Sequence, residues 1–248
     1  MSSDQMTIDP DVFKEHTPCL ENLADLIMNR MASLSPAEIA SILGVSNSLA
    51  IKAHNLAYDF SHKQTGYKAI FGFTGEAFRG LDAKTLSPEA IENAALNLRF
   101  ISSVYGILKA DDIIKPYRSE FTKEIAPGPS TPVKTFKSKV TVEVVRYIKE
   151  NKTGDIINLL PGDADKCLDW KIIRAFSSVH KIVFQTFDSS GRLKTPITQR
   201  LKELRGIMAR SIIENDIKSF QELTRFESPH FVFSPKDSKP LLPVFICE

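Results

Sequence analysis

The chain of 248 residues lacks several features that would assign it to a class at once. Its three cysteines, at positions 19, 167 and 247, are odd in number and scattered, which predicts neither a disulfide framework nor a zinc site. No apolar run approaches the roughly 18 residues that cross a bilayer. The first residues, MSSDQMTIDPD, lack the apolar segment of a secretory signal. We therefore expect a soluble, cytoplasmic protein that does not bind a membrane.

Net charge is also small, at +2, so the distribution of charge is more informative than its total. Residues 1–60 hold 3 basic and 8 acidic side chains, whereas residues 61–248 hold 29 and 22. Between positions 192 and 210 six basic residues stand against a single acid, Glu203. Such a cluster indicates either a face that binds a polyanion or an ordinary solvated helix face. The six are Arg192, Lys194, Arg200, Lys202, Arg205 and Arg210.

Recognisable catalytic chemistry is sparse as well. The five histidines show no metal spacing, and no nucleophile has a base in a known local pattern. Asp163, Asp165 and Asp169 follow a predicted strand but lack the glycine and glutamate of a calcium loop, which favours a polar loop. The sequence thus predicts no catalytic residue, no metal ligand and no cofactor, and it favours a protein that is not an enzyme.

The first third of the chain is predicted to be helical. Apolar residues recur at helical spacing over residues 20–31. Ser35, Pro36 and Glu38 then form a capping-box pattern, Gly44 ends that helix, and Ser46 caps another to about residue 58. This pair is compatible with a DNA-binding helix-turn-helix, but any compact helical hairpin gives the same pattern.

Helices and short strands follow in mixed order. The patterns predict helices over residues 87–105, 138–151 and 196–214, and strands at 155–160, 181–187 and near the carboxyl end. A hairpin turn is expected at residues 188–191, and the prolines at 127, 129 and 132 mark the expected internal seam. We expect an α+β fold in one domain, 1–248, with a flexible tail over about 1–15. In it a helical N-terminal third, carrying a helix-hairpin-helix-like element, packs on a mixed β-sheet.

Two basic segments are the candidates for binding phosphate. Residues 98–118, LRFISSVYGILKADDIIKPYR, are predicted to begin as an amphipathic helix that breaks at Gly106. The segment then continues through a charged turn into a basic stretch. Residues 200–210, RLKELRGIMAR, place Lys202 and Arg205 on one helix face. The alternative is that the tyrosines pack in the core and that Arg118 and Arg205 pair with nearby glutamates. The candidate residues are Tyr105 and Tyr117, which would stack on bases, with Lys109, Lys115, Arg118, Lys202, Arg205 and Arg210.

Together with GYKAIFGFTGEAFRGL at 66–81, these segments resemble the YaaA family of bacterial peroxide-stress proteins. The resemblance extends from about residue 20 to 233. It implies a one-domain α+β protein with a helix-hairpin-helix element and a positively charged cleft. It also implies DNA binding that protects the cell from hydrogen peroxide. The positions that match the family patterns are Tyr105, Gly106, Leu108, Pro116, Tyr117 and Arg118, then Lys202, Arg205, Gly206, Met208 and Arg210, and Asn158 and Leu159 at the start of a third.

The chain departs from the family pattern at three places. The expected opening strand ending in Ser-Pro-Ala-Lys is absent before Glu21. After Leu159 the serine, glutamate and tyrosine of the third pattern are replaced, and residues 135–138 stand where Phe-Trp-Gly is expected. Any chemical activity of the family is therefore expected to be lost or altered here.

These observations lead to one principal expectation and two alternatives. The chain is expected to bind double- or single-stranded DNA with low sequence specificity, in a cleft between the two basic segments. One alternative is an enzyme that acts on a nucleotide-like or phosphorylated small molecule in the same cleft. The other is a degenerate scaffold whose basic residues form surface pairs. The sequence leaves the oligomeric state open.

Overall fold

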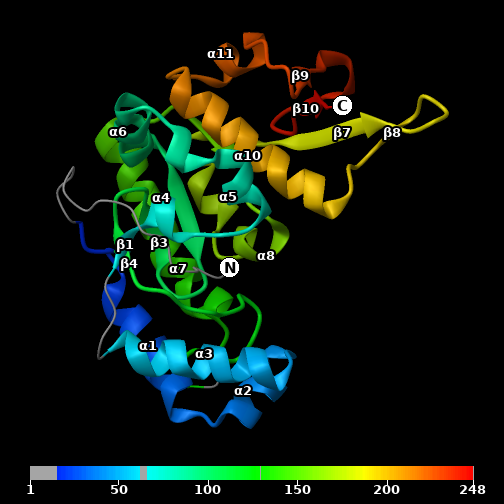
Figure 1. Cartoon of the computed structure of the whole chain (residues 1–248). Helices are drawn as coiled ribbons and strands as arrows, with labels where there is room; N and C mark the ends of the chain where they lie inside the picture. The colour runs from blue at the N-terminus through cyan, green and yellow to red at the C-terminus, as the bar shows by residue number, and fades with distance from the viewer. Residues whose placement is uncertain (1–15, 62–65, 129, 248) are drawn as a thin grey trace. The chain divides into compact units, whose positions relative to one another are not determined.

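The computed structural model of the chain, drawn in Figure 1, describes residues 16–61, 66–128 and 130–247. The chain separates into two compact units. Unit 1 comprises residues up to 75, 98–141 and 162–169, and unit 2 comprises 76–97, 142–161 and 170 onward. The tail expected over residues 1–15 lies outside the described residues. The proline-rich seam expected near residue 130 is wrong, because residues 98–141 all belong to unit 1. The single domain over 1–248 stays a prediction.

Three helices open unit 1, as the sequence predicts: α1 (Glu21–Ser33), α2 (Pro36–Leu43) and α3 (Asn47–Phe60). The capping box of α2 is confirmed. The Ser35 hydroxyl accepts from the Glu38 backbone N–H, and the Glu38 carboxylate accepts from the Ser35 N–H at 2.8 Å. Gly44 ends α2 with a φ of 67°, in the left-handed region that favours glycine. A reciprocal cap and a glycine stop together fix this helix locally.

The turn from Gly44 to Ser46 joins α2 to α3 in a compact hairpin. Ser46 occupies the N-cap position, but its hydroxyl lies 3.1 Å from that of Ser48 and makes no cap. Ile39 and Leu43 of α2 are buried, as are three alanines of α3 that permit close helix contact: Ala50, Ala53 and Ala57. The helix-hairpin-helix role of this element stays a prediction.

The helix predicted to run through residue 105 is wrong. Helix α6 (Pro88–Asn97) ends earlier, and an antiparallel hairpin of β2 (Arg99–Ser102) and β3 (Gly106–Lys109) follows. The turn is closed by the Ser102 hydroxyl, which accepts from the backbone N–H groups of Val104 and Tyr105. Phenylalanine and isoleucine in these strands favour extended structure, and Gly106, at a φ of 74°, completes the reversal.

The remaining elements of unit 1 are short strands and helices. Strand β1 (Tyr67–Lys68) pairs antiparallel with β4 (Ile113–Ile114), and α4 (Ala69–Gly72) follows β1 directly. Helix α7 (Pro132–Asn151) begins at Pro132, six residues before its predicted start, and its second half, from residue 142, belongs to unit 2. The Thr131 hydroxyl accepts from the Lys134 N–H at 3.3 Å, so the last proline of the loop is the first residue of a capped helix. Helix α8 (Gly162–Asp165) completes the unit.

Unit 2 combines helices with a mixed sheet, which confirms the α+β class. Its sheet has the order β8-β7-β10-β9, in which β7 and β10 are parallel and the outer pairs antiparallel. A separate parallel pair joins β5 and β6. The strands are β5 (Asp155–Asn158), β6 (Ser178–Lys181), β7 (Val183–Phe187), β8 (Leu193–Lys194), β9 (Val232–Phe233) and β10 (Val244–Ile246).

Helix α10 supplies much of the core of unit 2. The core cluster contains two residues of α10, Leu204 and Met208, packed with strand residues Phe184 and Phe245. Figure 1 shows α10 beside α5, and the two helices are in extensive contact. The helices of this unit, besides α6, are α5 (Glu76–Leu81), the 3-10 turn η1 (Ala83–Thr85), α9 (Trp170–Ile173), α10 (Thr198–Glu214), α11 (Phe220–Arg225) and the 3-10 turn η2 (Pro235–Asp237).

Candidate functional site

The two tyrosines of the first basic segment lie in the core of unit 1. Tyr105 is 2% exposed and Tyr117 is fully buried, and their rings are 5.9 Å apart, edge to face. Phe60 and Phe73 pack on the same pair. Buried rings present no face to a base, so the structure assigns both tyrosines to the core and not to a nucleic-acid surface.

The phenol groups of these tyrosines hold the chain in place. The Tyr105 oxygen accepts from the backbone N–H of Lys115 at 2.8 Å, and the Tyr117 oxygen lies 2.7 Å from that of Ser102. Burial raises the pKa of both phenols, so neither ionises near neutral pH. The Tyr-Gly and Pro-Tyr pairs of this pattern therefore form a buried joint, that is, a tightly packed contact inside the unit, between the β2–β3 hairpin and the segment after β4.

Lys115 is also engaged within unit 1. Its ammonium donates to the carbonyl oxygen of Phe60 at 2.8 Å and lies 5.0 Å from the centre of the Phe60 ring. Phe60 is the last residue of α3, where unsatisfied carbonyls and the helix dipole favour a cation. Lys115 thus caps α3, and contact with a phosphate would require it to leave that carbonyl.

Two cations of the first segment remain for a ligand. Lys109 ends β3 with its side chain exposed, while its backbone N–H donates to the Asp112 carboxylate at 2.8 Å. Burial raises the pKa of that carboxyl group. Arg118 is half-buried, directly after Tyr117. Lys109 is therefore the most accessible cation of this segment.

The second segment forms most of α10, and its glycine has a packing role. A β-carbon added at Gly206 would stand 1.8 Å from the carbonyl oxygen of Ala77 and 2.7 Å from the Leu81 nitrogen, both in α5. The facing Gly80 of α5 is equally tight, with the Glu203 carbonyl oxygen 2.2 Å from such a carbon. The two glycines let the backbones of α5 and α10 touch, which no larger residue permits.

Arg210 closes the end of α5. One terminal nitrogen of its guanidinium donates to the carbonyl oxygens of Leu81 and Asp82, at 3.1 and 2.9 Å, and to the Thr85 hydroxyl at 2.8 Å. The other binds Glu214, one turn further along α10, at 2.6 Å. A planar fork with several donors suits this set of carbonyls, so Arg210 is a structural cap of unit 2.

The other cations of α10 differ in exposure. Lys202 is exposed, and its charge helps to lower the pKa of the Glu76 carboxyl group, after the larger effect of Arg79. Arg205 is half-buried. Arg200 binds Glu203 at 2.9 Å. Since Arg118 belongs to unit 1 and Arg205 to unit 2, the convergence of the two segments into one cleft stays a prediction.

The third pattern also has a local structural role. Asn158 ends β5 and is 5% exposed, and its side-chain oxygen accepts from the Leu160 N–H at 3.0 Å. Beside it in unit 2, the Asp155 carboxylate binds the buried His180 at 2.8 Å and accepts the Phe220 N–H at 3.1 Å. Sequence reasoning missed this pair, because the two residues meet only through the pairing of β5 with β6.

Buried thiols limit redox chemistry at two of the three cysteines. Burial raises the pKa of Cys167 to about 12 and also raises that of Cys247. The thiolate is the reactive form, so both are poor nucleophiles in the folded chain. Among the described residues no group of three His, Cys, Asp or Glu side chains is placed to hold a metal ion. Nor does any helix in those residues combine the length and apolarity needed to cross a membrane.

The geometry defines an α+β protein whose most specific sequence patterns form buried joints and leave Lys109 and Lys202 exposed. Comparison with known families then identifies it further. The family described as "Peroxide stress protein YaaA" matches residues 2–237, and the chain belongs to that family.

Several curated relatives are similar over most of their length. A UPF0246 protein from Shewanella pealeana is 32% identical over 238 residues, which cover 93% of this chain and 90% of that protein. One from Shewanella sediminis is 31% identical over 237 residues, with the same coverage. One from Shewanella amazonensis is 33% identical over 220 residues, or 87% of this chain and 84% of the relative.

Proposed function

We propose that this chain is a DNA-binding protein of the peroxide-stress response, which acts in the cytoplasm and binds duplex or single-stranded DNA with little sequence preference. The observation that carries the proposal is the match to the peroxide-stress family over residues 2–237. The poor reactivity expected of the buried thiols Cys167 and Cys247 favours protection by binding over removal of peroxide at those groups.

Exposed cations in each unit support electrostatic binding. Lys109 of unit 1 and Lys202 of unit 2 present accessible ammonium groups, and Arg118 and Arg205, in the same two segments, are half-buried. Contacts of lysine and arginine with phosphates supply nearly all of the affinity in non-specific complexes. Each such contact releases counterions, so the affinity should fall steeply as salt rises.

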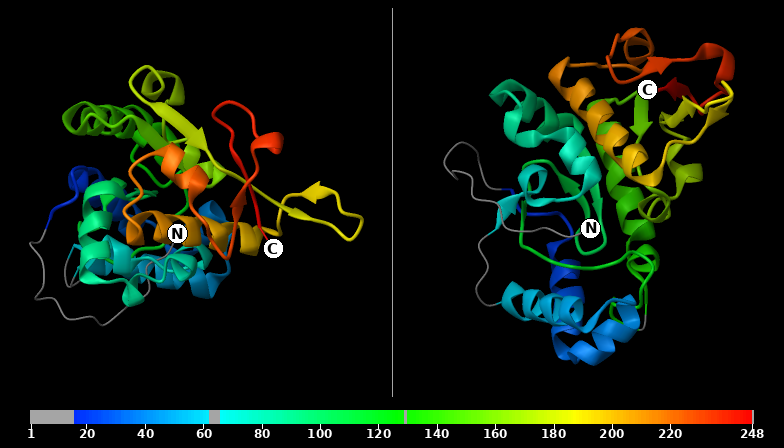
Figure 2. Two further views of the ribbon diagram at one scale, coloured as in Figure 1. Left: turned by 90° about the horizontal axis from the view of Figure 1, so that it is seen from above. Right: turned by 45° about the vertical axis from the view of Figure 1, so that its right-hand side comes forward.

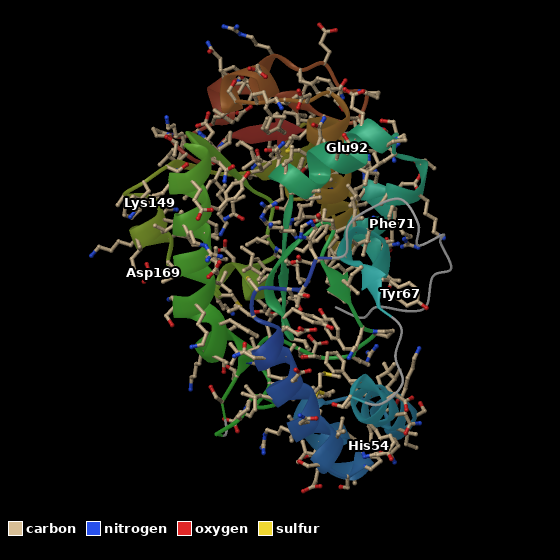
Figure 3. All side chains as sticks on the ribbon, turned by 90° about the vertical axis from the view of Figure 1, so that its left-hand side faces the viewer. His54, Tyr67, Phe71, Glu92, Lys149 and Asp169 are labelled. Carbon is tan, nitrogen blue, oxygen red and sulfur yellow. The ribbon has the colours of Figure 1, made fainter. Side chains whose placement is uncertain are left out.

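The test compares three lysine variants of the full chain on a labelled duplex. Lys202→Gln and Lys109→Gln each remove one exposed charge, and each lost phosphate contact should reduce the slope of log affinity against log salt by about 0.9. Lys149→Gln is the matched control. Lys149 is an exposed lysine of α7, labelled in Figure 3, whose ammonium lies 4.7 Å from the centre of the Phe176 ring.

The outcomes separate the proposal from its residue assignments. If the unmodified chain binds neither duplex nor single-stranded DNA at low salt, DNA binding is wrong. If it binds and the three variants share one salt slope, Lys109 and Lys202 are not the contacts. In cells that lack the protein, survival in hydrogen peroxide should be restored by the unmodified chain and less well by Lys202→Gln. A fluorescent fusion should be found in the cytoplasm.

A further inference from the structure

A projecting hairpin in unit 2 carries features that the family patterns do not explain. We call residues 183–197 the β7–β8 arm; it comprises β7, β8 and the chain that leads to α10. Its register pairs Thr186 with Lys194 and Phe187 with Leu193. Figure 1 and the left view of Figure 2 show the arm extending past the ends of β10 and α10. It is a two-stranded ribbon at its outer end.

The arm exposes large apolar side chains. Phe187 is 55% exposed beside the turn, and Ile197 is 76% exposed before α10. Because side chains alternate across a strand, the paired Phe187 and Leu193 share one face of the ribbon, and Thr186 and Lys194 share the other. A two-stranded ribbon is marginally stable by itself, so an exposed apolar face near its tip is favoured where it contacts a partner.

The charged residues of the arm indicate what kind of partner it contacts. The arm carries two cations, Arg192, whose side chain is 83% exposed, and the exposed Lys194. Its one acid, Asp188, is used inside the turn. There it accepts from the Ser190 N–H and hydroxyl and from the Arg192 N–H, and these bonds, led by the hydroxyl, lower the pKa of the carboxyl group. Arg192 also lies 3.6 Å from Asp188.

The outer end of the arm thus carries the exposed ring of Phe187 on one face of the ribbon and Lys194 on the other, with Arg192 beside the turn, where its Nε also donates to the Ser190 hydroxyl at 2.9 Å. The next cations along the chain, Arg200 and Lys202, extend the positive stretch into α10, with Glu203 as the only acid among them. An anionic polymer with a groove that can hold an apolar wedge satisfies both the charge and the apolar face. Proteins that enter the minor groove of duplex DNA use this combination, in which arginine and lysine contact phosphates and a phenylalanine wedges between base pairs.

We propose that the β7–β8 arm enters the minor groove of duplex DNA, with Phe187 wedged at a base step and the long side chains of Arg192 and Lys194 extending past the edge of the ribbon to the flanking phosphates. This inference rests on the proposed DNA binding and assigns it a contact that neither the family match nor the sequence patterns supply. It also implies that binding bends the duplex, because a wedge opens one side of a base step.

The experiment uses the full chain and a duplex that carries 2-aminopurine at central steps and a dye pair at its ends. Binding of the unmodified chain should raise 2-aminopurine fluorescence and shorten the end-to-end distance. Phe187→Ala should weaken binding roughly tenfold and abolish both signals, since stacking on an aromatic ring contributes strongly to affinity. Arg192→Gln with Lys194→Gln should lower the salt slope by about 1.8 and retain part of the 2-aminopurine signal.

Phe176→Ala is the matched control, because Phe176 is another exposed phenylalanine of unit 2, at 45%. It should leave affinity and fluorescence unchanged. Both phenylalanine variants should unfold at the same urea concentration as the unmodified chain, since neither removes a core residue.

Each remaining outcome overturns the inference in a distinguishable way. If the unmodified chain does not bind the duplex, the proposed function fails and the arm's role fails with it. If it binds, and Phe187→Ala matches it in affinity and fluorescence, DNA binding stands and the arm is wrong. If Phe187→Ala affects only single-stranded DNA, the groove is wrong. If it halves the mass in solution and leaves DNA binding intact, the arm is an interface between copies of the chain.

Discussion

The two segments with the most specific sequence patterns form buried joints by different means. In unit 1, Tyr105 and Tyr117 place polar atoms inside an aromatic core, where each phenol bonds a group of the chain. In unit 2, Gly206 removes a side chain so that two helix backbones touch, and Arg210 then caps the shorter helix from outside. The joint of unit 1 depends on large side chains that fill the core, and the joint of unit 2 depends on the absence of a side chain between two helices.

This difference separates structural from functional residues in each pattern. Residues that form such a joint tolerate little substitution. They therefore make a sequence pattern recognisable whether or not they contact a ligand. The exposed cations Lys109 and Lys202 stand between these joint residues and lie outside the buried contacts. Candidate contacts are therefore to be sought among the exposed residues of each segment, and the joints are to be tested as determinants of stability.

The glycine joint is expected to be the most sensitive to substitution. Gly206→Ala would place a carbon 1.8 Å from the backbone oxygen of Ala77, and a backbone group cannot rotate away. We expect a loss of about 3 kcal/mol or more in the free energy of unfolding, measured by urea denaturation. Gly154→Ala, where nothing lies within 4 Å of the added carbon, should change it by less than about 0.5 kcal/mol. Equal effects of the two would contradict close contact of α5 with α10.

The tyrosine joint is expected to respond less strongly. Tyr105→Phe keeps the ring that fills the core but removes the oxygen that accepts from the Lys115 N–H. A part-buried donor left unsatisfied costs about 1–3 kcal/mol, so we expect a loss near the middle of that range. Tyr58→Phe is the control, because Tyr58 is 54% exposed. Should Tyr105→Phe be as stable as the unmodified chain, the bond has no role in stability.

How far the sequence predicts this fold depends on whether the signal is local. The α2 helix was predictable because Ser35, Glu38 and Gly44 carry its start and stop within one short segment. The β2–β3 hairpin was not, because residues 98–105 carry a mixed pattern and the pairing of Phe100 with Leu108 decides between helix and strand. At α7 the signal was present, since Thr131 and Pro132 are a good cap and first residue, but neighbouring prolines favoured a loop.

The candidate site was predictable in part for the same reason. Sequence spacing places Lys202 and Arg205 three residues apart on one helix, and that local inference needs no tertiary contact. The burial of Tyr117 depends on Ser102 and Phe73, which are distant in sequence. The exposure of Phe187 likewise depends on where the hairpin extends. The turn at 188–191 was predicted and is confirmed, but a turn alone does not indicate what its flanking residues face.

The arginine cap gives a smaller expected effect than either joint. Arg210→Lys retains the charge but replaces a planar fork with a single ammonium, which cannot reach Leu81, Asp82 and Thr85 together. We expect a loss of about 1 kcal/mol in the free energy of unfolding, because the site is partly exposed. DNA affinity measured well below the unfolding temperature should be unchanged. A drop in affinity at unchanged stability would instead make Arg210 a ligand contact.

The smallest effect at neutral pH is expected at Cys167, where burial raises the thiol pKa from its ordinary 9.0 to about 12. The unfolded chain releases this proton at lower pH than the folded chain does, so stability is fully present below about pH 9 and falls as pH rises toward about 12. By about pH 9.5 the loss should be on the order of 1 kcal/mol. The measurement is urea denaturation restricted to the range from pH 8 to about 9.5. In this range the tyrosines Tyr105 and Tyr117, whose pKa values are also raised, contribute little to the pH dependence of stability. Cys167→Ala should flatten this fall, and an identical pH dependence in both proteins would show that the thiol is not buried as described.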